Sequence, residues 1–94
     1  MNKVTKVTVD RQCLRIGKPK KMCECPLAIA LHTALGGSWD VTYHDARCKV
    51  THRIINLTPQ LQHFVQQFDN GNEFLEPFSF LVEHLPLNKL VIVE

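Results

Sequence analysis

The stretch Cys25-Pro26-Leu27-Ala28-Ile29-Ala30-Leu31-His32-Thr33-Ala34-Leu35-Gly36-Gly37 decides how this chain folds. Pro26 suits the first position of a helix, because its missing N–H group would have no partner there. The two glycines that follow Leu35 favour the end of the helix at that point. Apolar side chains occupy most sides of the segment, which is typical of a buried helix. The sequence therefore predicts a helix over residues 26–35 at the centre of the core.

Segments on both sides of this helix resemble β-strands. Valines alternate imperfectly with polar residues between Met1 and Val9, and residues 38–43 alternate around Trp39 and Val41. Residues 16–25 read as a loop, since Gly17 and Pro19 break regular structure. After a turn at His44-Asp45, residues 47–54 alternate between a mostly apolar set and a mostly cationic set: Cys48, Val50, His52 and Ile54 against Arg47, Lys49, Thr51 and Arg53. Because successive side chains point to opposite faces of a strand, this pattern predicts Arg47, Lys49 and Arg53 in one row.

The C-terminal half holds a second helix and two further strands. Thr58 followed by Pro59 is typical of a helix start, and Gly71 favours its end. The apolar residues of this segment recur at helical spacing: Leu61, Phe64, Val65 and Phe68. Residues 78–83 alternate as a strand, and residues 89–93 can form a short last strand.

The predicted order is β-α-β-β-α-β-β within one domain that spans residues 1–94. Ninety-four residues leave no room for a second independent core. Tight connections between neighbouring strands favour antiparallel pairing. We therefore expect an α+β fold, with a mostly antiparallel four- to five-stranded sheet and two helices packed on one face.

Charge is distributed unevenly along the chain. Residues 1–53 carry ten lysines and arginines against four acids, whereas residues 54–94 carry one lysine against five acids. The net charge of +2 hides this asymmetry. Seven of the ten N-terminal bases fall within the first 21 residues. An asymmetry of this kind points to a polyanionic partner. The alternative is a solvated surface whose charge is uneven by chance.

The four cysteines allow two further hypotheses. A zinc site could draw on Cys13, Cys23, Cys25 and Cys48, although their spacing differs from that of the common zinc modules. The alternative is that the thiols are reduced and structural, because the first residues lack the apolar core of a secretory signal. Cys25 at a helix start near Lys20 and Lys21 could instead be an activated nucleophile, but no recognised catalytic signature surrounds it. We expect no enzymatic activity and no cofactor.

A basic surface is the remaining candidate site. The loop Lys18-Pro19-Lys20-Lys21 precedes the start of the predicted helix, where free N–H groups and the helix dipole favour an anion. Trp39 and Tyr43 could stack on bases if exposed, but their alternation with polar residues favours burial of at least one. The chain contains none of the common base-reading motifs. We therefore expect contacts to a nucleic-acid backbone or to an acidic protein surface.

Three blocks of the sequence bear a resemblance to known proteins. They are Cys25-Pro26-Leu27-Ala28-Ile29-Ala30-Leu31, then Phe64-Val65-Gln66-Gln67-Phe68-Asp69-Asn70-Gly71, then Glu76-Pro77-Phe78-Ser79-Phe80. With these blocks, residues 20–82 resemble a family of small phage-encoded proteins, and the chain looks like an anti-CRISPR inhibitor of the type I-F class. The blocks coincide with predicted core elements, so the resemblance implies no particular site residue.

The resemblance implies a stoichiometric inhibitor in the host cytoplasm. The partner would be the type I-F RNA-guided surveillance complex (Cascade/Csy), whose protein subunits and guide RNA are the candidate contacts. The inhibitor would block recognition of target DNA by this complex. No membrane contact and weak or no binding to free DNA are expected. Charge placement alone nominates the partner-binding residues: Lys3, Lys6, Arg11, Arg15, Lys18, Lys20, Lys21, Arg47, Lys49 and Arg53. The alternatives are a phage accessory protein that binds nucleic acid and a small zinc-binding module.

Overall fold

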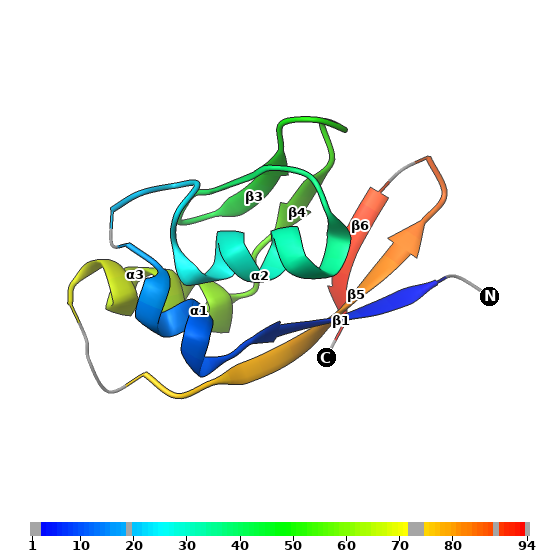
Figure 1. The fold of residues 1–94 in the computed structure, drawn as a ribbon. Helices are drawn as coiled ribbons and strands as arrows, with labels where there is room; N and C mark the ends of the chain where they lie inside the picture. The colour runs from blue at the N-terminus through cyan, green and yellow to red at the C-terminus, as the bar shows by residue number, and fades with distance from the viewer. Residues whose placement is uncertain (1–2, 19, 72–74, 88, 94) are drawn as a thin grey trace.

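The fold is α+β, as predicted, and a computed structural model describes residues 3–18, 20–71, 75–87 and 89–93 (Figure 1). Pro19, which was predicted to break regular structure, lies outside these residues. The elements follow in the order β1 (Val4–Val9), α1 (Arg11–Ile16), α2 (Pro26–Leu35), β2 (Trp39–Val41), β3 (Asp45–Cys48), β4 (Ile54–Asn56), α3 (Pro59–Asp69), β5 (Phe78–Leu85) and β6 (Lys89–Val93). None of the described helices is long and apolar enough to cross a bilayer.

The strands form two antiparallel sheets of three strands each, so the prediction of one four- to five-stranded sheet was wrong. The first sheet has the order β1-β5-β6 and the second has the order β2-β3-β4. β4 and β6 pack beside one another, but the hydrogen-bonded ladders do not continue between them. Alternation of side chains predicts where strands occur, but it does not specify which strands pair.

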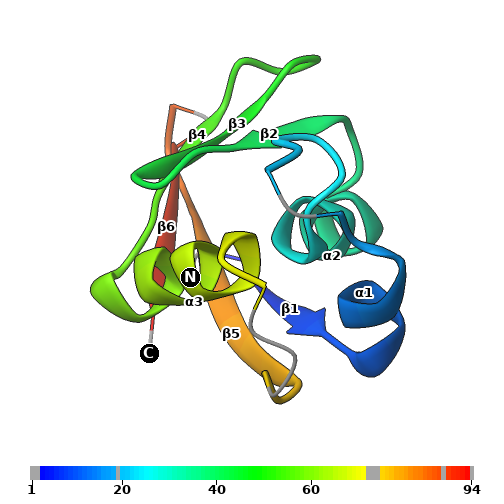
Figure 2. The same ribbon diagram turned by 90° about the vertical axis from the view of Figure 1, so that its left-hand side faces the viewer.

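Helix α2 packs against both sheets, and its predicted position at the centre of the core is confirmed. It contacts β1 of the first sheet and β2 of the second (Figure 2). Leu27, Ala30 and Leu31 are almost fully buried. Because α2 meets two sheets, it needs apolar side chains on more than one side, which explains the composition that marked it in the sequence. The sequence predicted both helices on one face of a single sheet, whereas α2 packs against two sheets.

The signals at the ends of the helices are confirmed by the backbone. Thr58 caps α3, and its Oγ1 accepts a hydrogen bond from the Leu61 N–H group at 3.4 Å. Cys25 occupies the corresponding position before α2, where its Sγ accepts from the Ala28 N–H group. Gly36 ends α2 with a φ of +73°, a conformation that favours glycine.

Helix α1 is an element that sequence reasoning did not predict. It is only six residues long, and it is capped by Asp10, whose Oδ1 accepts from the Cys13 N–H group at 2.8 Å. This hydrogen bond lowers the pKa of the Asp10 carboxyl group. Cys13 is buried, and α1 packs against α2. A Cβ atom on Gly17 would lie 2.7 Å from the Pro26 ring, so glycine permits this close approach. Tertiary contacts therefore stabilise a helix too short to persist alone.

The strand predicted over residues 47–54 was wrong, because the chain reverses direction inside it. β3 ends at Cys48 and β4 begins at Ile54. The Cys48 N–H group donates to the Arg53 carbonyl at 2.8 Å, and His52 has a φ of +61° in the turn. Residues 48 and 53 therefore face each other across a hairpin. The expected row of Arg47, Lys49 and Arg53 along one strand does not form.

Candidate functional site

The cysteines differ in their exposure to solvent. Cys13, Cys25 and Cys48 are buried, and Cys23 is exposed. Within the described residues, no three His, Cys, Asp or Glu side chains gather closely enough to hold a metal ion. The set proposed from sequence for zinc is therefore not brought together in this part of the chain.

Cys25 does not have the environment of an activated nucleophile. Burial raises the pKa of its thiol, which is opposite to the effect expected from Lys20 and Lys21. The thiol also lies against the first turn of α2, where it caps the Ala28 N–H group. In this structure the Cys25 thiol therefore serves as a cap of α2.

Cys48 is buried in the second sheet, as predicted, although its electrostatic environment differs from that of Cys25. Burial acts to raise the pKa of this thiol, but hydrogen bonds with Thr51, Val50 and Ser38 together outweigh burial and leave the pKa lowered. The side chain is only 2% exposed, and its Sγ atom would lie 2.7 Å from a Cβ atom at position 37. Gly37 thus keeps the backbone close to the sulfur.

The lysine loop, which we define as residues 17, 18 and 20–25, is fixed to the body of the protein by hydrogen bonds of its backbone. The Val41 N–H group of β2 donates to the Met22 carbonyl at 2.9 Å, so the loop follows the outer edge of the second sheet. The Lys20 N–H group donates to Asp69 Oδ1 at the end of α3, also at 2.9 Å. Tyr43 hydrogen-bonds to the same carboxylate, which raises the pKa of the Tyr43 hydroxyl group. Asp69 therefore joins the loop, the β2–β3 turn and α3.

The N-terminus of α2 is not available as the anion site that the sequence suggested. Residues 25–28 are buried, and the Cys25 thiol already accepts from one of the first N–H groups. Lys18 lies 3.9 Å from Glu24 Oε1. The exposed lysines at positions 18, 20 and 21 therefore present their charge to solvent beside the second sheet, rather than towards the helix start.

Arg47 and Lys49 lie on the outer side of the second sheet. They line a shallow hollow of about 400 Å³ together with His52, Asp40 and Ile54. Arg47 Nη2 lies 3.5 Å from Asp45 Oδ2, and Lys49 Nζ lies 3.3 Å from Asp40 Oδ1. Ion pairs that reach the surface contribute little to stability, so these bases can exchange their acidic neighbours for a partner.

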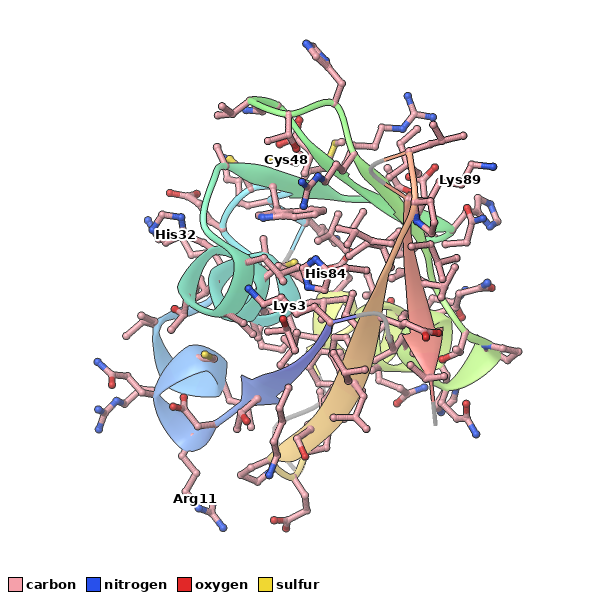
Figure 3. The ribbon with its side chains drawn as sticks, turned by 90° about the vertical axis from the view of Figure 1, so that its right-hand side faces the viewer. Lys3, Arg11, His32, Cys48, His84 and Lys89 are labelled. Atoms are coloured by element: carbon pink, nitrogen blue, oxygen red, sulfur yellow. The ribbon has the colours of Figure 1, made fainter. Side chains whose placement is uncertain are left out.

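Lys3 and Arg53 form a separate group around His84. Burial, with the nearby charges of Lys3 and Arg53, lowers the pKa of the His84 imidazole. Thr5 Oγ1 lies 2.8 Å from His84 Nε2, and the His84 N–H group donates to the Lys3 carbonyl at 2.8 Å. Figure 3 shows Lys3 and His84 in the same region, with Arg11 apart from them. Sequence reasoning had not associated His84 with any basic residue.

The three remaining bases lie on other parts of the surface. Arg11 and Arg15 belong to α1, and Arg11 Nη2 lies 3.5 Å from Glu76 Oε2. Lys6 is exposed on β1, opposite Leu81 of β5. The ten nominated bases thus divide among several groups. Five of them come from the lysine loop and from the outer side of the second sheet. Together with the neighbouring His52, which was not among the ten, they are called the loop–hairpin surface: Lys18, Lys20, Lys21, Arg47 and Lys49 with His52.

The two aromatic candidates for stacking differ in exposure. Trp39 is 3% exposed, and its Nε1–H group donates to the Gly36 carbonyl at 2.8 Å. Tyr43 is 44% exposed beside the lysine loop. The expectation that at least one ring would be buried is confirmed, and Tyr43 is the ring that a partner can reach.

Comparison with known proteins gives no relative for this chain. No protein-family model, no curated protein and no solved structure matches it. The arguments about function therefore rest on the residues themselves and on the resemblance of the three sequence blocks.

Proposed function

We propose that this chain is a non-catalytic binding protein that inhibits a type I-F RNA-guided surveillance complex. The loop–hairpin surface is its principal contact. The resemblance of the three sequence blocks supports the choice of partner, and the placement of charge supports the mode of binding. Occupation of a surface that holds nucleic acid would prevent the complex from capturing target DNA.

The observation that carries this proposal is the placement of the lysine loop beside the second sheet. The hydrogen bond between Val41 and Met22 places the loop next to β2, and β2 pairs with β3, which carries Arg47. The exposed loop lysines thus lie beside one edge of the second sheet, and Arg47 and Lys49 lie on the outer side of the same sheet. A polyanion lowers its electrostatic free energy where several such charges lie together.

The kind of contact follows from the chemistry of these side chains. Lysine ammonium groups bind phosphate or carboxylate oxygens without reading base sequence, whereas the Arg47 guanidinium group can form two parallel hydrogen bonds to either anion. Tyr43 adds an exposed ring beside the loop. The surface therefore suits a guide-RNA backbone or an acidic protein patch, and it does not suit sequence-specific reading of a duplex.

Co-purification with the type I-F surveillance complex tests the proposal. Wild-type protein should remain bound to the assembled complex, and the double substitution Lys20→Glu with Lys21→Glu should weaken binding at least tenfold. The tenfold figure assumes that each reversal of an exposed charge costs about 1 kcal/mol of binding free energy. Lys89→Glu is the matched control, because Lys89 is also exposed but lies on β6 outside the nominated residues. Wild-type protein that fails to co-purify would refute the choice of partner.

A gel shift with free RNA and DNA distinguishes the inhibitor from a general nucleic-acid-binding protein. The inhibitor should bind free nucleic acid weakly at about 50 mM and at about 200 mM salt. A general binder would shift both nucleic acids at the lower salt concentration, with affinity that falls steeply as salt rises. Tight binding to free DNA would therefore favour the accessory-protein alternative.

A further inference from the structure

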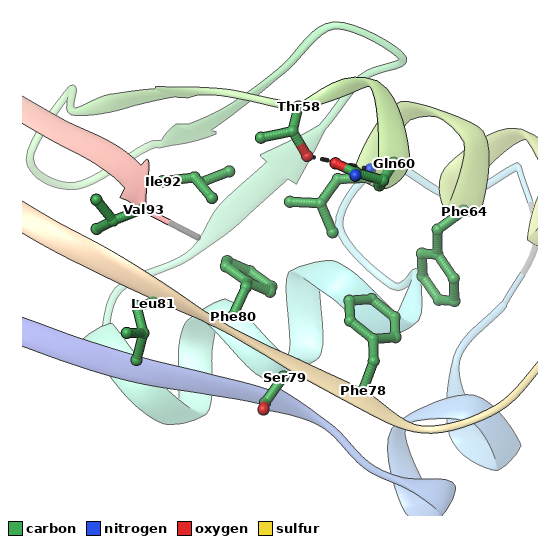
Figure 4. A pocket seen from close by; sticks show the side chains of 10 residues that line it. Thr58, Gln60, Phe64, Phe78, Ser79, Phe80, Leu81, Ile92 and Val93 are labelled. Carbon is green, nitrogen blue, oxygen red and sulfur yellow. Dashed lines mark hydrogen bonds between the residues drawn. The ribbon is translucent and has the colours of Figure 1, made fainter.

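An apolar pocket of about 510 Å³ opens between α3 and the end of the first sheet (Figure 4). Its walls come from the N-terminal half of α3, from β5 and from the last residues of β6. The volume lies within the range of about 300–1,000 Å³ that is typical of sites for small molecules. Phe64, Phe78 and Phe80 belong to the sequence blocks that were predicted to be core elements.

The pocket lies at the end of the first sheet where Val93 of β6 pairs with Leu81 of β5. β6 ends at Val93, which lies opposite Leu81, whereas β5 continues to Phe78. Among the described residues, Phe78–Phe80 pair with β1 alone.

Helix α3 contributes Leu61 and Phe64 to the wall that faces β5. The Phe64 and Phe78 rings meet edge to face with their centroids 4.8 Å apart. The Phe78 and Phe80 rings are nearly parallel at 6.3 Å. Phe78 and Phe80 are only partly buried, so these rings are accessible from the pocket. Arrangements of this kind accept a further ring by offset stacking or by an edge-to-face contact.

The polar groups of the pocket are few and uncharged. Thr58, Gln60 and Ser79 are its only polar side chains among the described lining residues, and none of those residues carries a charge. Thr58 Oγ1 already accepts from the Leu61 N–H group, which leaves Gln60 as the most versatile hydrogen-bonding side chain. A charged ligand would lose its hydration here without gaining an opposite charge. The lining therefore favours a neutral ligand.

We propose that this pocket binds a neutral, planar aromatic small molecule that carries one hydrogen-bonding group. Its ring system lies against Phe64, Phe78 and Phe80. Its polar group meets Gln60. The pocket does not include any of the ten nominated bases, so this activity is independent of the proposed contact with a ribonucleoprotein.

Titration with N-phenyl-1-naphthylamine tests this proposal, because this probe is neutral and aromatic and its fluorescence rises in an apolar site. Saturable binding to one site per chain is expected, with a Kd on the order of 100 µM or tighter. Ile92→Phe fills part of the pocket and should weaken binding at least tenfold. Val91→Phe adds the same ring on the neighbouring residue, which does not line the pocket, and should leave binding unchanged.

Amide chemical shifts of the wild-type protein provide a measurement that needs no variant. The probe should perturb the amides of residues 58–64, 78–81 and 92–93, and it should leave the lysine loop unperturbed. Absence of saturable binding, or equal effects of Ile92→Phe and Val91→Phe, would overturn the proposal. Tighter binding of an anionic naphthalene sulfonate than of the neutral probe would also overturn it. Displacement of the probe only by an extended apolar peptide, and not by small aromatic compounds, would assign the pocket to a peptide instead.

Discussion

Replacement of Leu27 by alanine should destabilise the protein strongly, because Leu27 is 0% exposed on the helix that packs against both sheets. Loss of a buried leucine side chain costs its transfer free energy and the free energy of the cavity that remains, about 3 kcal/mol in total. A domain of this size has a total stability of about 5–14 kcal/mol, so the loss is a large fraction. It corresponds to a decrease in Tm of about 12–24 °C.

Urea denaturation followed by circular dichroism measures this effect, and Leu87→Ala provides the matched control. Leu87 lies in the turn after β5 and is 88% exposed, so the same chemical change should alter the free energy of unfolding by about 0.5 kcal/mol or less. A Leu27→Ala variant that loses no more stability than the Leu87→Ala variant would refute the placement of α2 at the centre of the core.

Three further predictions concern a helix cap, the thiols and pH. Thr58→Ala should cost about 1 kcal/mol in the free energy of unfolding, because it removes the cap of α3; Thr33→Ala, on the exposed side of α2, should cost much less. In the native protein, a thiol reagent should label Cys23 rapidly and the buried cysteines only after urea is added; rapid native labelling of Cys25 would contradict its burial. Because the pKa of His84 is lowered in the folded state, the unfolded chain binds a proton first, and stability should fall as pH drops through about 6.5. His84→Gln should remove this contribution in denaturation curves measured between pH 8 and pH 5, and an unchanged slope would count against it.

The helices that the sequence predicted have signals in their own residues. Pro26 and Pro59 both stand at the first helical position, and each follows a side chain that caps the helix. β5 was likewise predictable from the alternation of its side chains, and a short last strand was also expected over residues 89–93. Helix α1 is only six residues long, and it depends on contacts between Cys13 and the rest of the core. Such contacts are tertiary, so local patterns do not predict them.

The hairpin between β3 and β4 shows why alternation can mislead. Polarity alternates through residues 48–54 without a glycine, asparagine or proline to indicate a turn. The reversal instead requires His52 in a left-handed conformation, which few side chains adopt. As a result, the positions of Arg47 and Arg53 could not be read from a strand pattern. The uneven distribution of charge was visible in the sequence, whereas the neighbours of each base depend on this turn and on the strand register.

The most direct test of the proposed function is capture of target DNA by a purified type I-F surveillance complex. The wild-type protein in molar excess should abolish capture when it is added before the DNA. The Lys20→Glu, Lys21→Glu variant should require at least tenfold more protein for the same inhibition, and the Lys89→Glu variant should act as the wild type does. Undiminished DNA capture in the presence of excess wild-type protein would contradict the proposal.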